Sequence, residues 1–159
     1  MNNQILPSIS NMGALATLTG DLWLEGNPSL QNLDGLTGLT HIQGLVYLNN
    51  NLVLESLAGL ANVHTVNSAF VISNNAALNA VDGLEGLTTL GWSFQIEANQ
   101  ILGNLDGLYG VTSVADNFSI QNNPALPTCA ADGLRDNIGV ENIGGTVTIA
   151  GNDDGGICP

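Results

Sequence analysis

Apolar and polar positions alternate along the chain in a pattern that repeats every 24 residues. Residues 20–43, 44–67, 68–91 and 92–115 are four consecutive copies, and a fifth opens at Asp116 and then departs from the pattern. A fixed repeat of this size is typical of a solenoid, an array or a propeller. Because a copy is too short for a propeller blade and contains no long helical stretch, the pattern predicts a solenoid with one coil per copy.

Each copy begins with a predicted strand. Its third and fifth positions are apolar and alternate with outward-facing residues, which indicates a short strand with one buried face. The pairs are Leu22/Leu24, Val46/Leu48, Phe70/Ile72, Phe94/Ile96 and Phe118/Ile120. With a last strand in the tail, we expect six parallel strands, near residues 22–24, 46–48, 70–72, 94–96, 118–120 and 147–149.

An asparagine follows each predicted strand at the same distance. These are Asn27, Asn51, Asn75, Asn99 and Asn123. Their amides can bond the backbone of neighbouring coils, so we expect a structural ladder. Apolar residues then recur at every third position, which favours tight, 3₁₀-like or turn-rich backbone over an α-helix.

The resulting pattern, L-x-I-x-x-N-x-x-L-x-x-L-x-G-L-x-x-L-x-x-V, resembles leucine-rich repeats, and more closely the receptor L-domain. The best copies are FVISNNAALNAVDGLEGLTTL (70–90) and FSIQNNPAL (118–126). The resemblance covers residues 6–159. It implies a mainly β, right-handed parallel β-solenoid that serves in extracellular binding.

We expect residues 1–159 to form a single solenoid domain. A half coil over 6–19, with Leu6, Ile9, Met12, Leu15 and Leu18 at its apolar positions, precedes four coils over 20–115. The last coils and a C-terminal cap occupy 116–159, because the end of a solenoid must cover its apolar interior. At the N-terminal end, either residues 1–8 fold over the opening or the solenoid continues into another domain.

The tail carries the signals of a cap. Residues 127–140 predict one short amphipathic helix with Thr128 as its N-cap. Cys129 and Cys158 flank the unit, and we expect them to form a disulfide, with two free buried thiols as the alternative. A disulfide implies an oxidising compartment and hence a secreted or cell-surface protein. The start lacks the features of a signal peptide, so the chain is either cytosolic or begins after a removed leader.

Charge excludes several classes of partner. The formal net charge is −13, and Lys plus Arg is 1. Binding to nucleic acid or to an anionic membrane surface needs many cations, so neither is expected. No apolar stretch is long enough for a membrane helix, so we expect no membrane insertion. The protein is expected to be part of a longer surface protein or a monomer.

No constellation points to catalysis. His41 and His64 have no acidic neighbour in sequence and are expected to face solvent, so neither a nucleophilic set nor a metal pair is predicted. Asp34, Asp82 and Asp106 form a column for which a turn role is favoured over calcium binding. We expect no enzyme activity, no cofactor and no metal.

Two surfaces remain for binding. The outer face of the predicted sheet suits a protein or glycan ligand, because exposed aromatic rings lie beside carboxylates. Its residues are Asp21, Trp23, Glu25, Leu45, Tyr47, Asn49, Val71 and Gln95. An alternative is that Trp23 and Tyr47 cover the sheet beneath a neighbouring domain or terminus.

The second surface consists of two stacked rows rich in threonine. Its residues are Thr17, Thr40, Thr65, Thr88, Thr89, Thr112 and Ser113. Such arrays resemble those of ice-binding proteins, although His41 and His64 interrupt them. Ice binding is therefore the second hypothesis, and a structural spacer or filament unit is the third.

Overall fold

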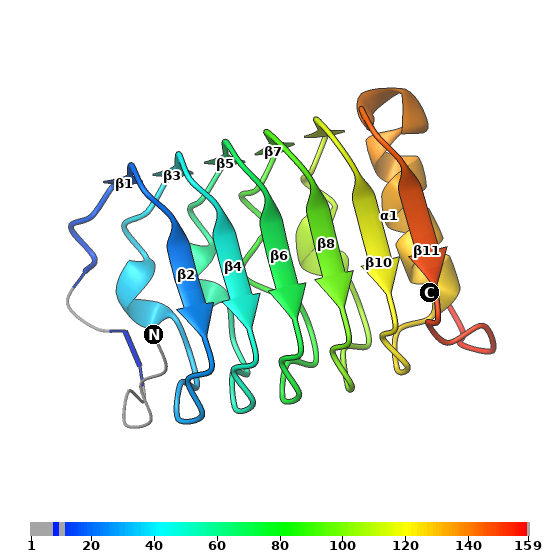
Figure 1. The fold of residues 1–159 in the computed structure, drawn as a ribbon, viewed down its shortest axis with the longest axis horizontal. Coiled ribbons are helices and arrows are strands. Elements are labelled where there is room, and N and C mark those ends of the chain that lie inside the picture. The colour runs from blue at the N-terminus through cyan, green and yellow to red at the C-terminus, as the bar shows by residue number, and fades with distance from the viewer. Residues whose placement is uncertain (1–7, 10–11, 159) are drawn as a thin grey trace.

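The computed structural model describes residues 8–9 and 12–158, and it is a mainly β, parallel solenoid, as the sequence predicts (Figure 1). All six predicted strands are present and form one parallel sheet in the order β11-β10-β8-β6-β4-β2. The strands are β2 (Leu22–Glu25), β4 (Val46–Asn49), β6 (Phe70–Ser73), β8 (Phe94–Glu97), β10 (Phe118–Gln121) and β11 (Val147–Ala150). Up to β10, neighbouring strands pair in a register of one repeat, so equivalent residues of successive coils stack in columns.

The core consists of these columns. The inward strand positions hold Phe70, Phe94 and Phe118, whose ring centroids are 6.1 and 5.6 Å apart in successive coils. All three side chains are buried, and the leucines at every third position of the rest of each coil pack against them. The apolar pattern of the sequence therefore corresponds to a continuous interior.

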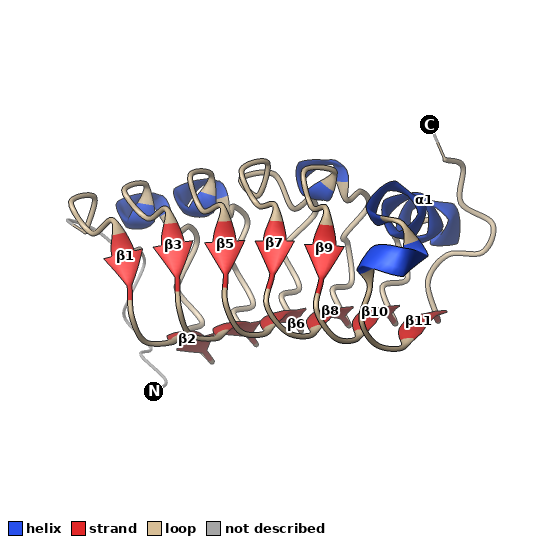
Figure 2. Cartoon of the chain, turned by 90° about the horizontal axis from the view of Figure 1, so that it is seen from above, coloured by secondary structure: helices blue, strands red, loops and turns tan. Residues whose placement is uncertain are grey.

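A second parallel sheet, which the sequence did not predict, lies on an adjoining side of the solenoid, where each of its strands leads within a few residues into a strand of the first sheet (Figure 2). Its strands have two residues each: β1 (Thr17–Leu18), β3 (His41–Ile42), β5 (Thr65–Val66), β7 (Thr89–Leu90) and β9 (Ser113–Val114). A two-residue strand is too short to show the alternation by which strands are recognised in a sequence. In the sequence, these strands are hidden within the stretch in which apolar residues recur at every third position.

The predicted tight backbone is confirmed on the side of the solenoid opposite the six-stranded sheet (Figure 2). Three 3₁₀ helices, η1 (Asp34–Leu36), η2 (Ala58–Leu60) and η3 (Asp106–Leu108), form on this side. A Cβ on Gly59 or on Gly107 would collide with the backbone of the preceding coil, so glycine is required by close approach there.

The predicted cap is also present. Helix α1 (Thr128–Ile138) precedes η4 (Val140–Asn142) and β11, and a disulfide joins Cys129 to Cys158 with a Cα–Cα distance of 6.0 Å. The prediction that Thr128 is the N-cap is wrong. Pro127 occupies that position, and the Thr128 hydroxyl instead donates to Asp154 Oδ1 over 2.6 Å. This charge-assisted bond ties the start of the helix to the C-terminal segment.

The N-terminal end differs from the capped end. Ile9, Leu15 and Leu18 are partly buried against the core and Met12 is 43% exposed, while Leu6 lies outside the described residues. A cavity of about 510 Å³ opens here, lined mainly by apolar side chains of the first two coils. No helix in the described part of the chain has the length and apolarity needed to cross a membrane.

Candidate binding surfaces

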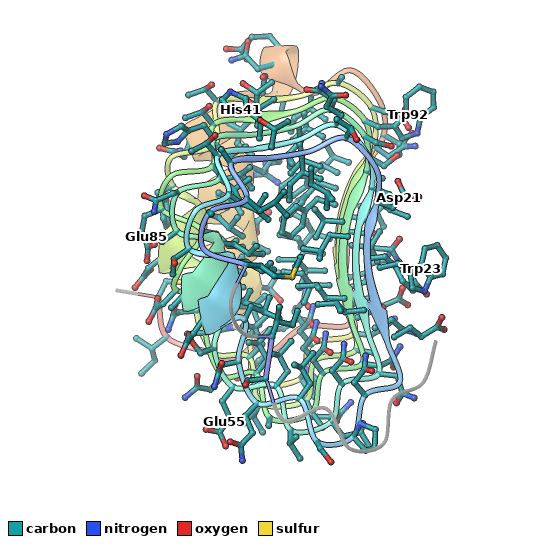
Figure 3. All side chains as sticks on the ribbon, turned by 90° about the vertical axis from the view of Figure 1, so that its left-hand side faces the viewer. Asp21, Trp23, His41, Glu55, Glu85 and Trp92 are labelled. Atoms are coloured by element: carbon teal, nitrogen blue, oxygen red, sulfur yellow. A yellow bond between two sulfur atoms is a disulfide. The ribbon has the colours of Figure 1, made fainter. Side chains whose placement is uncertain are left out.

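The outer face of the six-stranded sheet carries an aromatic pair. Trp23 on β2 and Tyr47 on β4 are register partners, and their ring centroids lie 4.4 Å apart with an interplanar angle of 37°. Trp23 is 49% exposed, whereas Tyr47 is half-buried. Strand alternation places both rings outward, because their neighbours in the strand point into the core. Figure 3 shows Trp23 on this side and Glu85 on the opposite side of the solenoid.

A carboxylate is held beside the aromatic pair. The indole N–H of Trp23 donates to Glu25 Oε2 over 3.0 Å, and Asn49 Nδ2 donates to Glu25 Oε1 over 3.3 Å. Asn49 Oδ1 in turn accepts bonds from Ser73 Oγ and Asn74 Nδ2. This network fixes the positions of the indole and the carboxylate before any ligand arrives.

Three further carboxylates lie at the same face, each held by neutral donors. Asp21 Oδ1 accepts the backbone N–H of Leu45 over 2.8 Å. Glu97 Oε2 accepts a bond from Gln95 Nε2, and Asp116 Oδ2 accepts one from Ser93 Oγ, both over 2.6 Å. Neither Glu97 nor Asp116 is among the predicted ligand-binding residues, although strand alternation already turns Glu97 outward in the column of Glu25 and Asn49.

The remaining predicted residues of the face are neutral. Leu45 precedes β4, and Val71 and Gln95 lie on β6 and β8 in the column of Trp23 and Tyr47. All three are half-buried. The structure therefore gathers the eight predicted residues on one face, with the pair Trp23 and Tyr47 at the β2 end and Val71 and Gln95 further along. Trp92, an exposed indole that was not predicted for the site, lies on the same side (Figure 3).

Within residues 8–9 and 12–158, the carboxylates of this face form no ion pair. The only Lys or Arg is Arg135 on α1, which forms ion pairs with Asp132 and Asp136 over 2.6 and 2.8 Å. The hydrogen bond to Asp136 raises the pKa of Arg135 above its ordinary value. The neutral donors on the sheet face position the carboxylates but leave their negative charge uncompensated.

Two predicted threonine rows follow the five-stranded sheet, the first directly before its strands and the second within them. The hydroxyls of the two rows differ in hydrogen bonding. In the first row, Thr40, Thr88 and Thr112 donate their hydroxyls to backbone carbonyls of the preceding coil over 3.0 to 3.1 Å. In the second row, Thr17, Thr65, Thr89 and Ser113 share one register with His41. Within the described residues, the hydroxyls of Thr65 and Thr89 form no hydrogen bond.

The two histidines lie close together, His41 in β3 and His64 directly before β5. Both are exposed, and their ring centroids are 6.5 Å apart. His64 Nδ1 lies 3.0 Å from the carbonyl oxygen of Gly86, and His41 Nδ1 lies 2.9 Å from Thr40 Oγ1. Over residues 8–9 and 12–158, no group of three or more His, Cys, Asp and Glu side chains is arranged to hold a metal ion.

The predicted asparagine ladder is confirmed and has one further rung. Asn51 Oδ1 accepts the backbone N–H of Asn27 over 3.1 Å, while Asn51 Nδ2 donates to the carbonyl of Leu24. The same bonds recur at each coil and end at Asn152, which accepts the N–H of Asn123. Asn152 follows the inward strand residue Ile149 by three residues, the same spacing as in the other coils. This spacing could have predicted Asn152 as a member of the ladder from the sequence.

Comparison with protein-family models, with curated proteins and with solved structures finds no significant match to this chain.

Proposed function

We propose that this protein is a non-catalytic extracellular binding module of the leucine-rich-repeat, receptor L-domain-like type. It recognises a protein or glycan ligand through the outer face of the six-stranded sheet. The disulfide between Cys129 and Cys158 supports an oxidising, secreted or cell-surface location.

One observation carries the proposal: an exposed indole is fixed in place at the solvent side of a rigid sheet. Trp23 stacks on Tyr47 and is hydrogen-bonded to Glu25. Burying such a ring on binding provides a large contact area at a small entropic cost, because its conformation is already restricted.

The test is a binding screen on glycan and cell-surface protein panels with three proteins. These are the wild type, the double variant Trp23→Ala/Tyr47→Ala, and the control Tyr109→Ala. Tyr109 is 45% exposed and follows η3, away from the six-stranded sheet, so the control removes a similarly exposed aromatic ring outside the proposed face. We expect a ligand that binds the wild type and the control but not the double variant.

The screen also defines the contradicting result. If the double variant folds with an unchanged circular dichroism spectrum and retains full affinity for a ligand found with the wild type, the sheet face is not the binding surface. The variant is expected to fold, because both rings project outward and the core columns are unaltered.

A second candidate function, ice binding, is favoured by the second threonine row. Thr65 and Thr89 are register partners on a parallel sheet, and their hydroxyls are not used by the protein within its described part. Neighbouring strands impose a regular spacing of about 4.8 Å on the row. His41 interrupts this row. The hydroxyls of Thr40, Thr88 and Thr112 in the first row already donate to backbone carbonyls, so among the described residues only the second row offers free hydroxyls to ice.

A further inference from the structure

The chemistry of the sheet face specifies its partner more closely than the proposed function does. The four carboxylates Asp21, Glu25, Glu97 and Asp116 are each held by neutral N–H or O–H donors. In the part of the chain that the structure describes, none is paired with a cation, because the single Lys or Arg of the sequence is Arg135, which lies on α1 and is bound to Asp132 and Asp136. A face that positions carboxylates and leaves their charge uncompensated is complementary to a cationic ligand.

The aromatic pair points to the same kind of ligand. An indole face is the strongest aromatic acceptor for a cation, and arginine stacks on it while bonding a carboxylate. Trp23 and Glu25 are joined by a bond of 3.0 Å, so one guanidinium can contact the ring and the carboxylate together. A neutral glycan can use the ring and donate hydroxyls to the carboxylates, but it does not compensate their charge.

The spacing of the carboxylates across the sheet defines how far apart two cationic groups of the partner must be. Glu25 and Glu97 occupy one column, linked by register through Asn49 and Ser73. Three strand spacings of about 4.8 Å separate them by roughly 14 Å. An extended chain advances about 3.4 Å per residue, so side chains four residues apart span this distance.

We propose that the partner is a protein that presents an extended segment with two arginines four residues apart, lying across the strands of the sheet. One arginine contacts Trp23 and Glu25, and the other contacts Glu97. This inference rests on the proposed function, since it assigns a partner to the same face.

The test uses a capped synthetic peptide with two arginines separated by three neutral residues. Binding is followed by the fluorescence of Trp23 in the Trp92→Phe protein, in which Trp23 is the only tryptophan. We expect the double variant Glu25→Gln/Glu97→Gln to bind the peptide about tenfold more weakly, because two charge contacts are lost.

A matched control separates a site from general attraction to an acidic protein. Glu55→Gln/Glu85→Gln changes the net charge by the same amount, and Figure 3 shows both residues away from Trp23. Its affinity is expected to stay within about twofold of the parent protein, since charges beyond the Debye length are screened.

Three results would overturn the inference. They are an equal loss of affinity in both double variants, no binding of the peptide to the parent protein, and a neutral glycan that binds the sheet face independently of salt. The third result would leave the proposed function intact. In contrast, a ligand that still binds Trp23→Ala/Tyr47→Ala would remove the proposed function itself.

Discussion

Trp23 and Tyr47 stack one coil apart, with ring centroids separated by 4.4 Å on the solvent side of the sheet. Tyr47 therefore covers one side of the indole and limits its motion. In a Trp92→Phe background, we expect Tyr47→Ala to increase acrylamide quenching of Trp23 and to lower stability by about 0.5–1.5 kcal/mol. Unchanged quenching would show that Tyr47 does not hold the indole in place.

The asparagine ladder makes a larger contribution to stability. Asn75 is fully buried, accepts the N–H of Asn51 and donates to the carbonyl of Leu48. Asn75→Ala leaves both backbone groups unsatisfied, so we expect a loss of about 2–5 kcal/mol in urea unfolding. The control Asn62→Ala removes one exposed bond, to Thr37, and is expected to cost less than about 1 kcal/mol. Equal losses would contradict the ladder's structural role.

Ala98 occupies a backbone conformation that favours glycine. Its φ is 57°, and the equivalent positions of other coils hold glycine or asparagine, as in Gly26 and Asn74. Ala98→Gly is expected to raise the free energy of unfolding by about 0.5–1 kcal/mol, because the left-handed region is costly for alanine. Ala61, with φ of −59°, is the control, and Ala61→Gly should be destabilising. A destabilised Ala98→Gly protein would refute the argument.

The disulfide holds the cap closed. Cys129 and Cys158 are 29 residues apart in sequence, which in the chain-entropy model corresponds to about 3–4 kcal/mol. We expect Cys129→Ala/Cys158→Ala to lower the melting temperature and to increase amide hydrogen exchange in α1 and β11 more than in β4 and β6. Uniform acceleration over all coils would mean that the cap does not unfold as a separate unit.

The ice-binding hypothesis makes a separate prediction that needs no ligand. If it holds, the wild type shapes ice into facets and shows thermal hysteresis, and Thr65→Tyr/Thr89→Tyr abolishes both by interrupting the row of free hydroxyls. Thr40→Val is a useful comparison, because its hydroxyl already donates to Ala16, so its loss should matter less. Round ice discs with the wild type would eliminate this function.

The sequence predicted the parts of the fold that depend on a strict period. Inward Phe70 and Phe94, and buried Asn51 and Asn75, recur every 24 residues, and each has one physical reason for its position. The second sheet was not predicted because its strands have only two residues. The prediction of Thr128 as N-cap was wrong because its hydroxyl is used in a bond to Asp154, 26 residues away, and the helix begins one residue earlier, after Pro127. Such a contact depends on tertiary structure.

The candidate site was only partly predictable for a related reason. The column positions of Trp23, Tyr47 and Glu25 follow from strand alternation, so their common face was predicted. The hydrogen bond between Trp23 and Glu25 joins side chains whose rotamers the sequence does not determine. The contribution of Asp116 depends likewise on its contact with Ser93 in the preceding coil.

Oxidative footprinting of the protein with its captured ligand tests the binding face most directly. Trp23 and Tyr47 report on the sheet face, and Tyr109, which is 45% exposed and follows η3, serves as an internal control. We predict that the ligand protects Trp23 and Tyr47 from oxidation and leaves Tyr109 unchanged. Protection of Tyr109 with Trp23 and Tyr47 unaffected would contradict the account.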